Sequence, residues 1–285
     1  MLQLIADNKV VDIKRIQYSD GAVGFDLGDF PINTKSVVIS IDPTFKVSGL
    51  LDELTQLMWT LSEVKNVFDK TFSISLYVPY LPYARNDRKF SFSGNFGLEI
   101  FIRSVSDLGV NKLITVDPHN PDAFESWCNV HRMKADYTTQ LQAFIQTMQR
   151  EHISPQKEWD VVIAPDKGAR DKAAAIANCY NIPLICCTKE RDVSTGKLSN
   201  PVVPERVDGL NCLIVDDLLD YGGTYIQLAQ ELYKQGATFI DLYVTHLIAA
   251  KGLSVLTNSI NKVYTYQTCC GYVTMQDVQK FNKGE

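Results

Sequence analysis

Three acidic residues stand where an apolar stretch of the chain runs into a glycine pair. The segment "CLIVDDLLDYGGTYIQLAQELYKQGA" (212–237) carries Asp216 and Asp217 directly after a strand-like run, and Asp220 just before the two glycines. Ligands of open α/β sheets bind beyond the carboxyl ends of the strands. We therefore expect Asp216 and Asp217 to accept hydrogen bonds from the neighbouring hydroxyls of a ribose.

The residues that follow are suited to a phosphate. In the loop Asp220, Tyr221, Gly222, Gly223 and Thr224, backbone N–H groups can surround an anion, because glycine allows close approach and a helix N-terminus adds partial positive charge. No Gly-Lys-Ser/Thr follows, so the loop is not a Walker A motif. The alternative is a tight turn with an aspartate helix cap.

Strands and helices alternate along the chain, which favours α/β units with parallel strands. We expect strands at 36–41, 72–78, 112–116, 161–164, 183–186, 212–215 and 239–244. We expect helices at 50–64, 97–108, 138–150, 169–180, 224–235 and 252–256. In the helix at 224–235, Tyr225, Leu228, Ala229 and Leu232 fall on one face.

The two halves of the chain resemble each other in pattern. In each half an apolar strand leads into a charged loop, "SISLYVP" into "YARNDRK" and "DVVIAPD" into "KGARDK". This repetition predicts two related α/β domains, 1–148 and 149–285, with the boundary in the polar stretch 149–158.

Bulk composition bounds the class of protein. A net charge of -5 and a pI near 5.5 argue against a nucleic-acid-binding surface, which needs clustered Lys and Arg. The seven cysteines show no metal-site spacing, so we expect free, buried thiols. The chain has no long apolar run for a membrane span or a signal peptide, and we expect a cytoplasmic protein.

Two further polar clusters follow strand-like runs. Arg85, Asn86 and Asp87, continued by Arg88 and Lys89, could grip phosphate oxygens and read a base edge. Lys189 and Arg191 introduce the polar stretch 190–200, which we expect to be a loop that closes over a site. His119 and Asp166 each follow a strand as well, although a lone histidine is more often structural and an aspartate there can cap a helix.

Several segments carry a family resemblance. "LIVDDLLDYGGT" resembles the phosphoribosyl-diphosphate loop shared by type I phosphoribosyltransferases and ribose-phosphate diphosphokinases. "YVPYLPYARNDRK", "LITVDPH" and "IAPDKGARDKAAAIA" with "ICCTKERD" follow in the order and at spacings similar to the diphosphokinases. The resemblance extends from about residue 70 onward and implies two tandem type I phosphoribosyltransferase-like domains, each a mainly parallel sheet flanked by helices.

The resemblance implies an activity and its requirements. A ribose-phosphate diphosphokinase transfers the β,γ-diphosphate of ATP to the anomeric hydroxyl of ribose 5-phosphate and releases AMP. It uses Mg²⁺ and assembles as a homo-oligomer, a dimer or a hexamer built from dimer units. By the same resemblance, the domain 1–148 binds ATP and the domain 149–285 binds the ribose phosphate.

Residue roles follow from the same resemblance. Arg85 and Asn86, with Asp87, match the ATP-binding segment. His119 matches the magnesium-site histidine, and Asp166 matches a carboxylate shared by ribose and Mg²⁺. Lys189 and Arg191 match the two cations that stabilise charge on the transferring group.

Two of the chain's departures from the family pattern bear on its substrates. "QYSDGAV" supplies Tyr18 and Asp20 for adenine contact, but Ala22 stands where the family has Glu. Tyr221 stands where the family commonly has Thr, which removes a short donor and adds a stacking face. A 5-substituted ribose such as ADP-ribose is therefore an alternative acceptor, and a phosphoribosyltransferase or a non-catalytic regulatory relative are alternatives of other classes.

Overall fold

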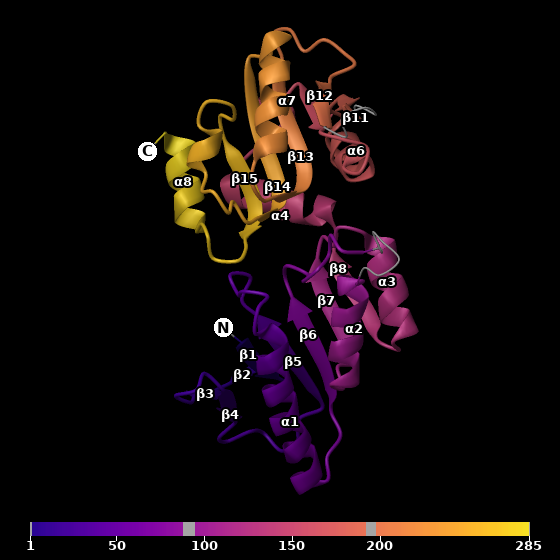
Figure 1. Cartoon of the computed structure of the whole chain (residues 1–285), viewed down its shortest axis with the longest axis vertical. Coiled ribbons are helices and arrows are strands. Elements are labelled where there is room, and N and C mark those ends of the chain that lie inside the picture. The colour runs from indigo at the N-terminus through magenta and orange to yellow at the C-terminus, as the bar shows by residue number, and fades with distance from the viewer. Residues whose placement is uncertain (1, 88–94, 192–197, 285) are drawn as a thin grey trace. The chain divides into compact units, whose positions relative to one another are not determined.

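The computed structural model describes residues 2–87, 95–191 and 198–284, and of residues 189–191 and 198–200 the backbone alone. The chain divides into two compact units, Met1–Thr138 and Thr139–Glu285 (Figure 1). Each unit is an α/β structure with its own sheet.

The division between the units comes before helix α4 (Gln140–Glu151), whereas the sequence predicts a boundary between 148 and 149. The helix belongs to the second unit because Phe144 and Met148 pack in the same buried cluster as Trp159 and Val162. The buried face of a helix, rather than the polar stretch after it, decides to which unit the helix belongs.

The first unit contains a six-stranded sheet in the order β2-β1-β5-β6-β7-β8. Its strands are β1 (Leu2–Ala6), β2 (Lys9–Val11), β5 (Ser36–Ile41), β6 (Ser73–Val78), β7 (Lys112–Val116) and β8 (Lys134–Thr138). The strands β5 to β8 are parallel, and the hairpin of β1 and β2 adds antiparallel strands at one edge. Asp7 and Asn8 form the two-residue turn of this hairpin with positive φ, the turn type that suits the twist of paired strands.

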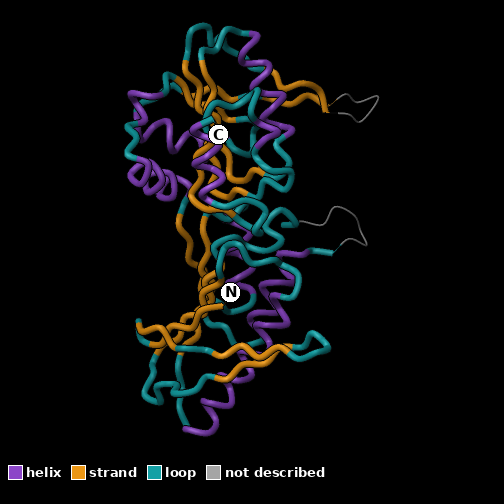
Figure 2. Tube along the Cα trace, turned by 90° about the vertical axis from the view of Figure 1, so that its left-hand side faces the viewer, coloured by secondary structure: helices purple, strands orange, loops and turns teal. Residues whose placement is uncertain are grey.

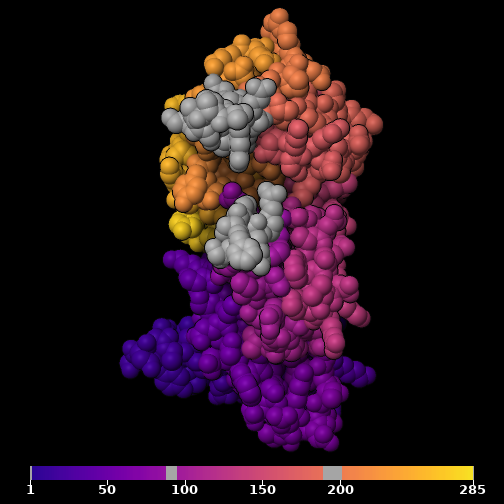
Figure 3. Space-filling view, turned by 45° about the vertical axis from the view of Figure 1, so that its right-hand side comes forward, coloured from indigo at the N-terminus to yellow at the C-terminus, as the bar shows by residue number. Residues whose placement is uncertain are grey.

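Helices and a separate hairpin complete the first unit. The helices are α1 (Leu50–Phe68), α2 (Gly97–Asp107) and α3 (Pro121–Val130), and the hairpin consists of β3 (Lys14–Gln17) and β4 (Val23–Asp26). The hairpin contacts α1, and Arg15 Nη2 lies 2.7 Å from Glu53 Oε1 on that helix. In Figure 3 the indigo N-terminal segment protrudes from the surface of this unit.

The second unit contains a five-stranded, fully parallel sheet in the order β10-β9-β13-β14-β15. Its strands are β9 (Val161–Ala164), β10 (Leu184–Cys186), β13 (Asn211–Leu219), β14 (Phe239–Leu247) and β15 (Val263–Thr268). Alternate residues of β9 belong to different buried clusters. Val161 and Ile163 lie in one cluster, and Val162 and Ala164 lie in the other. Both faces of the sheet are therefore covered, as the continuous apolar runs predict.

Helices pack against this second sheet (Figure 1). They are α4, α5 (Pro155–Glu158), α6 (Arg170–Tyr180), α7 (Gly223–Lys234) and α8 (Met275–Lys283). The buried residues of α7 are Tyr225, Leu228, Ala229 and Leu232, so the predicted face is confirmed. At 252–256, where the sequence predicts a helix, the structure forms a single 3₁₀ turn, η1 (Ser254–Leu256).

The predicted loop at 190–200 is wrong in its described part. Strands β11 (Thr188–Arg191) and β12 (Leu198–Val202) pair antiparallel and form the orange pair at the upper right of Figure 2. β12 contacts α7. Antiparallel pairing uses backbone groups, so a polar sequence alone does not indicate a loop.

All seven cysteines lie in the described residues and are free thiols, as expected. Their burial varies: Cys128, Cys187, Cys212 and Cys269 are buried, while Cys179 is exposed.

The helices in the described part of the chain include none that combines the length and the apolar character needed to cross a membrane.

Candidate functional site

Asp216 and Asp217 lie within strand β13, which continues to Leu219. The sequence predicts that this strand ends at residue 215, and the prediction is wrong because pairing with β14 holds the chain extended as far as Leu219. Pairing with β9 on the other side stops at Ile214. The carboxylates therefore lie beyond the carboxyl end of β9, at the sheet edge where ligands of this architecture bind.

The Asp216 carboxyl is held at both oxygens. The backbone N–H of Asp217 donates to Oδ1 at 2.9 Å, and the Tyr225 hydroxyl lies 2.9 Å from Oδ2. The same hydroxyl lies 2.6 Å from the carbonyl oxygen of Leu218. Gln140 Nε2 also donates to the Asp216 carbonyl oxygen at 2.9 Å, so both the side chain and the backbone of Asp216 are fixed.

Burial, and next the charge of Asp217, raise the pKa of the Asp216 carboxyl to about 7. The Tyr225 hydroxyl oxygen lies within hydrogen-bond distance of two acceptors, Asp216 Oδ2 and the Leu218 carbonyl oxygen. The hydroxyl carries one hydrogen, so it can donate to one of them at a time. When Asp216 is protonated, its hydroxyl can donate to the tyrosine oxygen while the tyrosine donates to the carbonyl, so the neutral acid links all three oxygens. When Asp216 is ionised, the Tyr225 hydroxyl donates to the carboxylate, a bond that lowers the pKa of Asp216.

A lysine faces the second carboxylate. Lys172 Nζ on α6 lies 3.9 Å from Asp217 Oδ2, and both side chains are largely buried, at 19% and 12% exposed. The cation offsets part of the repulsion among the clustered acids. Asp166 lies two residues past the end of β9, and its Oδ1 accepts from the N–H groups of Gly168 and Ala169 at 2.9 and 3.2 Å. That oxygen stabilises the turn before α6, whose N-cap residue is Ala169 and which has no side-chain cap.

Gly222 gives the predicted phosphate loop its sharp turn into α7. Its φ is +80°, and a Cβ there would lie 3.2 Å from Leu256 Cδ2. The N–H of Ala250 donates to the Asp220 carbonyl at 3.1 Å, which connects the loop to the segment after β14. Gly223 and Thr224 are the first two residues of α7, where the helix dipole favours an anion.

Tyr221 is 59% exposed in the middle of this loop. Lys251 Nζ lies 5.4 Å from the centre of its ring, within the range of a cation–π contact. The loop thus presents an aromatic face and a cation beside the helix N-terminus.

In the first unit, two predicted segments meet at one hydrogen bond. Asn120 Nδ2 donates to Asp87 Oδ2 at 2.8 Å, while Asn120 Oδ1 accepts from the N–H of Ala123 and caps α3. The bond brings the segment of Arg85, Asn86 and Asp87 to the segment that carries His119. Arg85 and His119 are exposed, whereas Asn86 is half-buried.

Tyr18 and Asp20 lie in the turn of the β3–β4 hairpin, which contacts α1. Asp20 Oδ1 accepts from the N–H of Ala22 at 3.0 Å and so stabilises its own turn. Within this unit the structure does not bring the hairpin to the segments of Asp87 and Asn120. A role of Tyr18 and Asp20 in adenine recognition stays a prediction.

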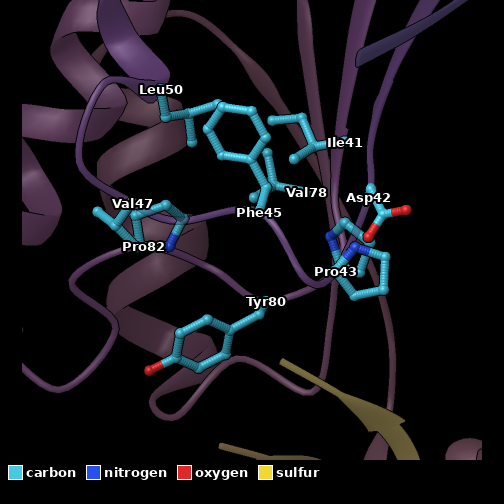
Figure 4. A pocket seen from close by; sticks show the side chains of 10 residues that line it. Ile41, Asp42, Pro43, Phe45, Val47, Leu50, Val78, Tyr80 and Pro82 are labelled. Carbon is cyan, nitrogen blue, oxygen red and sulfur yellow. The ribbon is translucent and has the colours of Figure 1, made fainter. Parts of the chain in front are cut away.

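A small recess lies at the carboxyl ends of β5 and β6 (Figure 4). The ring of Phe45 packs between Leu50 and Ile41, and the hydroxyl of Tyr80 points away from them. The cavity measures about 10 Å³, the room of a single water, whereas nucleotide pockets need several hundred. This recess is not a nucleotide site.

A larger hollow of about 560 Å³ lies at the opposite end of the second sheet, before β15. Asn261 and Asn282 in its wall already bond to backbone: Asn261 Oδ1 accepts from the N–H of Ile240, and Asn282 Oδ1 from that of Val263. The hollow lies at the amino ends of the strands, away from the carboxylates.

Some predicted residues lie outside the described part of the structure. Lys189 and Arg191 are placed on the backbone of β11, two positions apart, but their side chains lie outside the described atoms. Arg88 and Lys89 also fall outside the described residues.

Among the side chains at these sites that sequence reasoning missed are Lys172, Asn120 and Tyr225. Lys172 had a signal, because a cluster of acids needs a cation and α6 begins with several charged residues. Asn120 had the signal of a polar residue before a proline at a helix start. Tyr225 had none, since its spacing predicts a core position and only the structure shows its hydroxyl at Asp216.

The donors of the second unit fit magnesium better than a softer metal. Among the described residues, no group of three or more His, Cys, Asp and Glu is arranged to hold a metal ion by itself. Mg²⁺ is commonly bound by one or two carboxylates, retained waters and substrate phosphates, and Asp166 can supply such a carboxylate.

Comparison with known proteins agrees with this geometry. A model of the phosphoribosyl transferase domain matches residues 138–279, close to the whole second unit. A ribose-phosphate pyrophosphokinase of Sulfurisphaera tokodaii is 30% identical over 219 residues, which are 76% of this chain and 70% of the relative. One of Saccharolobus solfataricus is 29% identical over 180 residues, 63% of this chain and 59% of the relative.

A solved structure supports the fold of the whole chain. The phosphoribosylpyrophosphate synthetase of Mycobacterium smegmatis superposes with a TM-score of 0.68 at 21% identity, over 90% of this chain and 80% of that one. The expected architecture of two tandem phosphoribosyltransferase-like α/β domains is confirmed. Together with the sequence relatives, this shows that the chain belongs to the ribose-phosphate pyrophosphokinase family.

Proposed function

We propose that the protein transfers the β,γ-diphosphate of ATP to the anomeric hydroxyl of ribose 5-phosphate and releases AMP. The observation that carries the proposal is the junction of β13 and α7, where clustered carboxylates stand beside a glycine loop at a helix N-terminus. The carboxylates suit the ribose hydroxyls, and the glycine loop suits the 5-phosphate.

The reaction is a displacement at the β-phosphorus. The bond from the anomeric oxygen to that phosphorus forms, the bond from the phosphorus to the oxygen of AMP breaks, and the hydroxyl proton leaves to solvent. Such a reaction depends on alignment and on neutralising negative charge. Asp217 orients the ribose by accepting hydrogen bonds from its hydroxyls, and Gly222, Gly223 and Thr224 hold its phosphate through backbone N–H groups.

The first unit holds ATP in this proposal. Arg85 grips phosphate oxygens, and Asn86 reads the base edge with its amide. Asp87 is held by Asn120 at 2.8 Å and orders the segment. Mg²⁺ would supply charge neutralisation. His119 in the first unit and Asp166 in the second are the residues that would hold Mg²⁺, each in part through waters.

Lys189 and Arg191 stabilise the charge of the transferring diphosphate in this proposal, by likeness to the family pattern. Replacing either by Ala removes a cation that acts in the transition state, so kcat should fall about a hundredfold or more. Steady-state rates of AMP release measure the effect, with circular dichroism as the test of folding. Unchanged kcat in both variants contradicts the role.

A second candidate acceptor is a 5-substituted ribose such as ADP-ribose. The specific observation that favours it is Tyr221, whose exposed ring lies 5.4 Å from Lys251 Nζ at the phosphate loop. An exposed ring offers a stacking face to a further group, and Lys251 offers a charge to a second phosphate. The names of the relatives favour ribose 5-phosphate.

One assay tests the function and separates the acceptors. ATP and Mg²⁺ are mixed with the protein and either ribose 5-phosphate or ADP-ribose, and AMP is measured. AMP that forms only with a sugar acceptor supports diphosphoryl transfer, and the ratio of kcat/KM identifies the acceptor. No AMP with either acceptor contradicts the proposal and leaves a phosphoribosyltransferase or a regulatory relative.

We further propose that the active form is a homo-oligomer, as the family relationship suggests.

A further inference from the structure

Tyr225 connects the two parts of the candidate ribose-phosphate site, the strand with the acids and the phosphate loop. It is the third residue of α7, and its side chain is only 4% exposed. Its hydroxyl reaches back across the loop to β13, 2.9 Å from Asp216 Oδ2 and 2.6 Å from the Leu218 carbonyl oxygen. One side chain thus connects the strand that carries the acids to the helix that begins at the phosphate loop.

The contact leaves Asp216 little freedom to turn toward a ligand. Oδ1 is held by the N–H of Asp217 and Oδ2 by Tyr225, while Gln140 holds the carbonyl. Asp217 is the next residue, and alternate residues of a strand face opposite sides. A fixed Asp216 therefore fixes the direction of Asp217, whose carboxylate lies 3.9 Å from Lys172 Nζ.

We propose that Tyr225 is a positioning residue of the ribose-phosphate site, which through Asp216 and Leu218 fixes the carboxylate of Asp217 relative to the phosphate loop. The inference rests on the proposed function for the identity of the ligand. It divides the adjacent acids into an internal support, Asp216, and a ligand-binding group, Asp217. It also explains why a polar hydroxyl is buried on a helix face that otherwise carries Leu228, Ala229 and Leu232.

The test removes the hydroxyl and keeps the ring. Tyr225→Phe should weaken binding of ribose 5-phosphate about tenfold, the effect of about 1.4 kcal/mol, and leave ATP binding unchanged. Calorimetric Kd values for both ligands, with ADP-ribose as a third probe, measure this without turnover. A role in folding alone would lower Tm without a selective loss of ribose-phosphate affinity.

Tyr233→Phe is the matched control. Tyr233 lies on the same helix, and its hydroxyl donates to Asn261 Oδ1 at 2.8 Å. Its loss removes a tyrosine hydrogen bond at the amino ends of the strands, away from the carboxylates. This variant should bind every probe as the parent does. Equal affinities of Tyr225→Phe and Tyr233→Phe for ribose 5-phosphate and for ADP-ribose overturn the inference.

A double-mutant cycle tests the route through Asp216. Asp216→Asn should weaken ribose-phosphate binding by a similar factor, and adding Tyr225→Phe should cost little more, because residues that act through one contact are not additive. Additive losses overturn the inference. If Tyr225→Phe does not fold, Asp216→Asn alone tests the inference. Unchanged affinity of Asp216→Asn for ribose 5-phosphate would contradict it.

The outcomes separate this inference from the proposed function. Failure to release AMP with a parent protein that still binds ribose 5-phosphate contradicts the function alone, and the Kd comparison still decides the role of Tyr225. Normal AMP release with equal affinities in parent and Tyr225→Phe contradicts the inference alone. A parent protein that binds neither ribose probe contradicts both.

Discussion

At the scale of single residues, Asp216 is a carboxyl whose pKa the fold raises toward neutral pH. Burial and the charge of Asp217 raise the pKa of Asp216 to about 7, far above the ordinary value of 3.8. The neutral form can link the oxygens of Asp216, Tyr225 and Leu218. A site that receives an anionic phosphate also benefits from one negative charge fewer.

This acid predicts how stability changes with pH. A carboxyl whose pKa is raised by folding contributes stability that is complete below its unfolded value and is lost as pH rises through the folded value. Between about pH 5 and about pH 8, the parent should therefore lose on the order of 2 kcal/mol relative to Asp216→Asn, which does not titrate. Urea unfolding of both proteins at the two pH values measures the free energies of unfolding. An equal change with pH in the two proteins would refute the raised pKa of Asp216.

At the scale of elements, the turn between β13 and α7 depends on a single glycine. Gly222 has φ +80°, and an added Cβ would lie 3.2 Å from Leu256 and 3.5 Å from Val255. Gly223, the next residue, has no positive φ, and a Cβ there would meet no atom within 4 Å. Adjacent glycines thus have different roles.

Paired alanine substitutions should separate those roles. Gly222→Ala should lower the free energy of unfolding by about 2 kcal/mol, because it combines left-handed strain with a tight contact. Gly223→Ala should leave it unchanged or raise it by about 0.5 kcal/mol, since alanine restricts the unfolded chain. Thermal and urea unfolding check both, and similar losses in the two variants would contradict the role of the positive φ.

How far sequence reasoning succeeds depends on whether a local pattern or a partner decides an element. The buried face of α7 follows from spacing alone and is found residue for residue. The strand with Asp216 and Asp217 exceeds its apolar run because β14 pairs with it to Leu219. The β11–β12 ribbon was missed for the same reason, since antiparallel pairing needs no apolar residues.

The same distinction between local patterns and distant partners applies to the site residues. Glycine and aspartate in the loop could be predicted because their conformational and chemical roles are local. The bond of Asn120 to Asp87 spans 33 positions, and the bond of Gln140 to Asp216 spans 76. Contacts of that kind arise from the topology of the sheet, which a single sequence specifies only indirectly.

At the scale of the whole molecule, two α/β units of one architecture carry different polar residues at their strand ends. The first presents Arg85 and Asn86, donors suited to phosphate and base, beside Asp87, which accepts a hydrogen bond from Asn120. The second presents carboxylates and a glycine loop, a set suited to a sugar and its phosphate. If each unit binds its own substrate, damage to one site should leave affinity at the other unchanged.

Matched substitutions in the two units test this division. Arg85→Ala should raise the KM for ATP about tenfold to a hundredfold and leave the KM for the ribose substrate unchanged, because it removes a charged donor to phosphate. Asp217→Asn should do the reverse, because it weakens an acceptor of the sugar hydroxyls. Arg103→Ala is the control: its side chain is 68% exposed on α2 and pairs with Asp107 at 3.7 Å, a surface contact worth little. Steady-state rates of AMP release with each substrate varied in turn give all the constants. If Arg85→Ala and Asp217→Asn each raise both KM values, the two substrates do not have separate units, and a shared site would have to replace the division of labour.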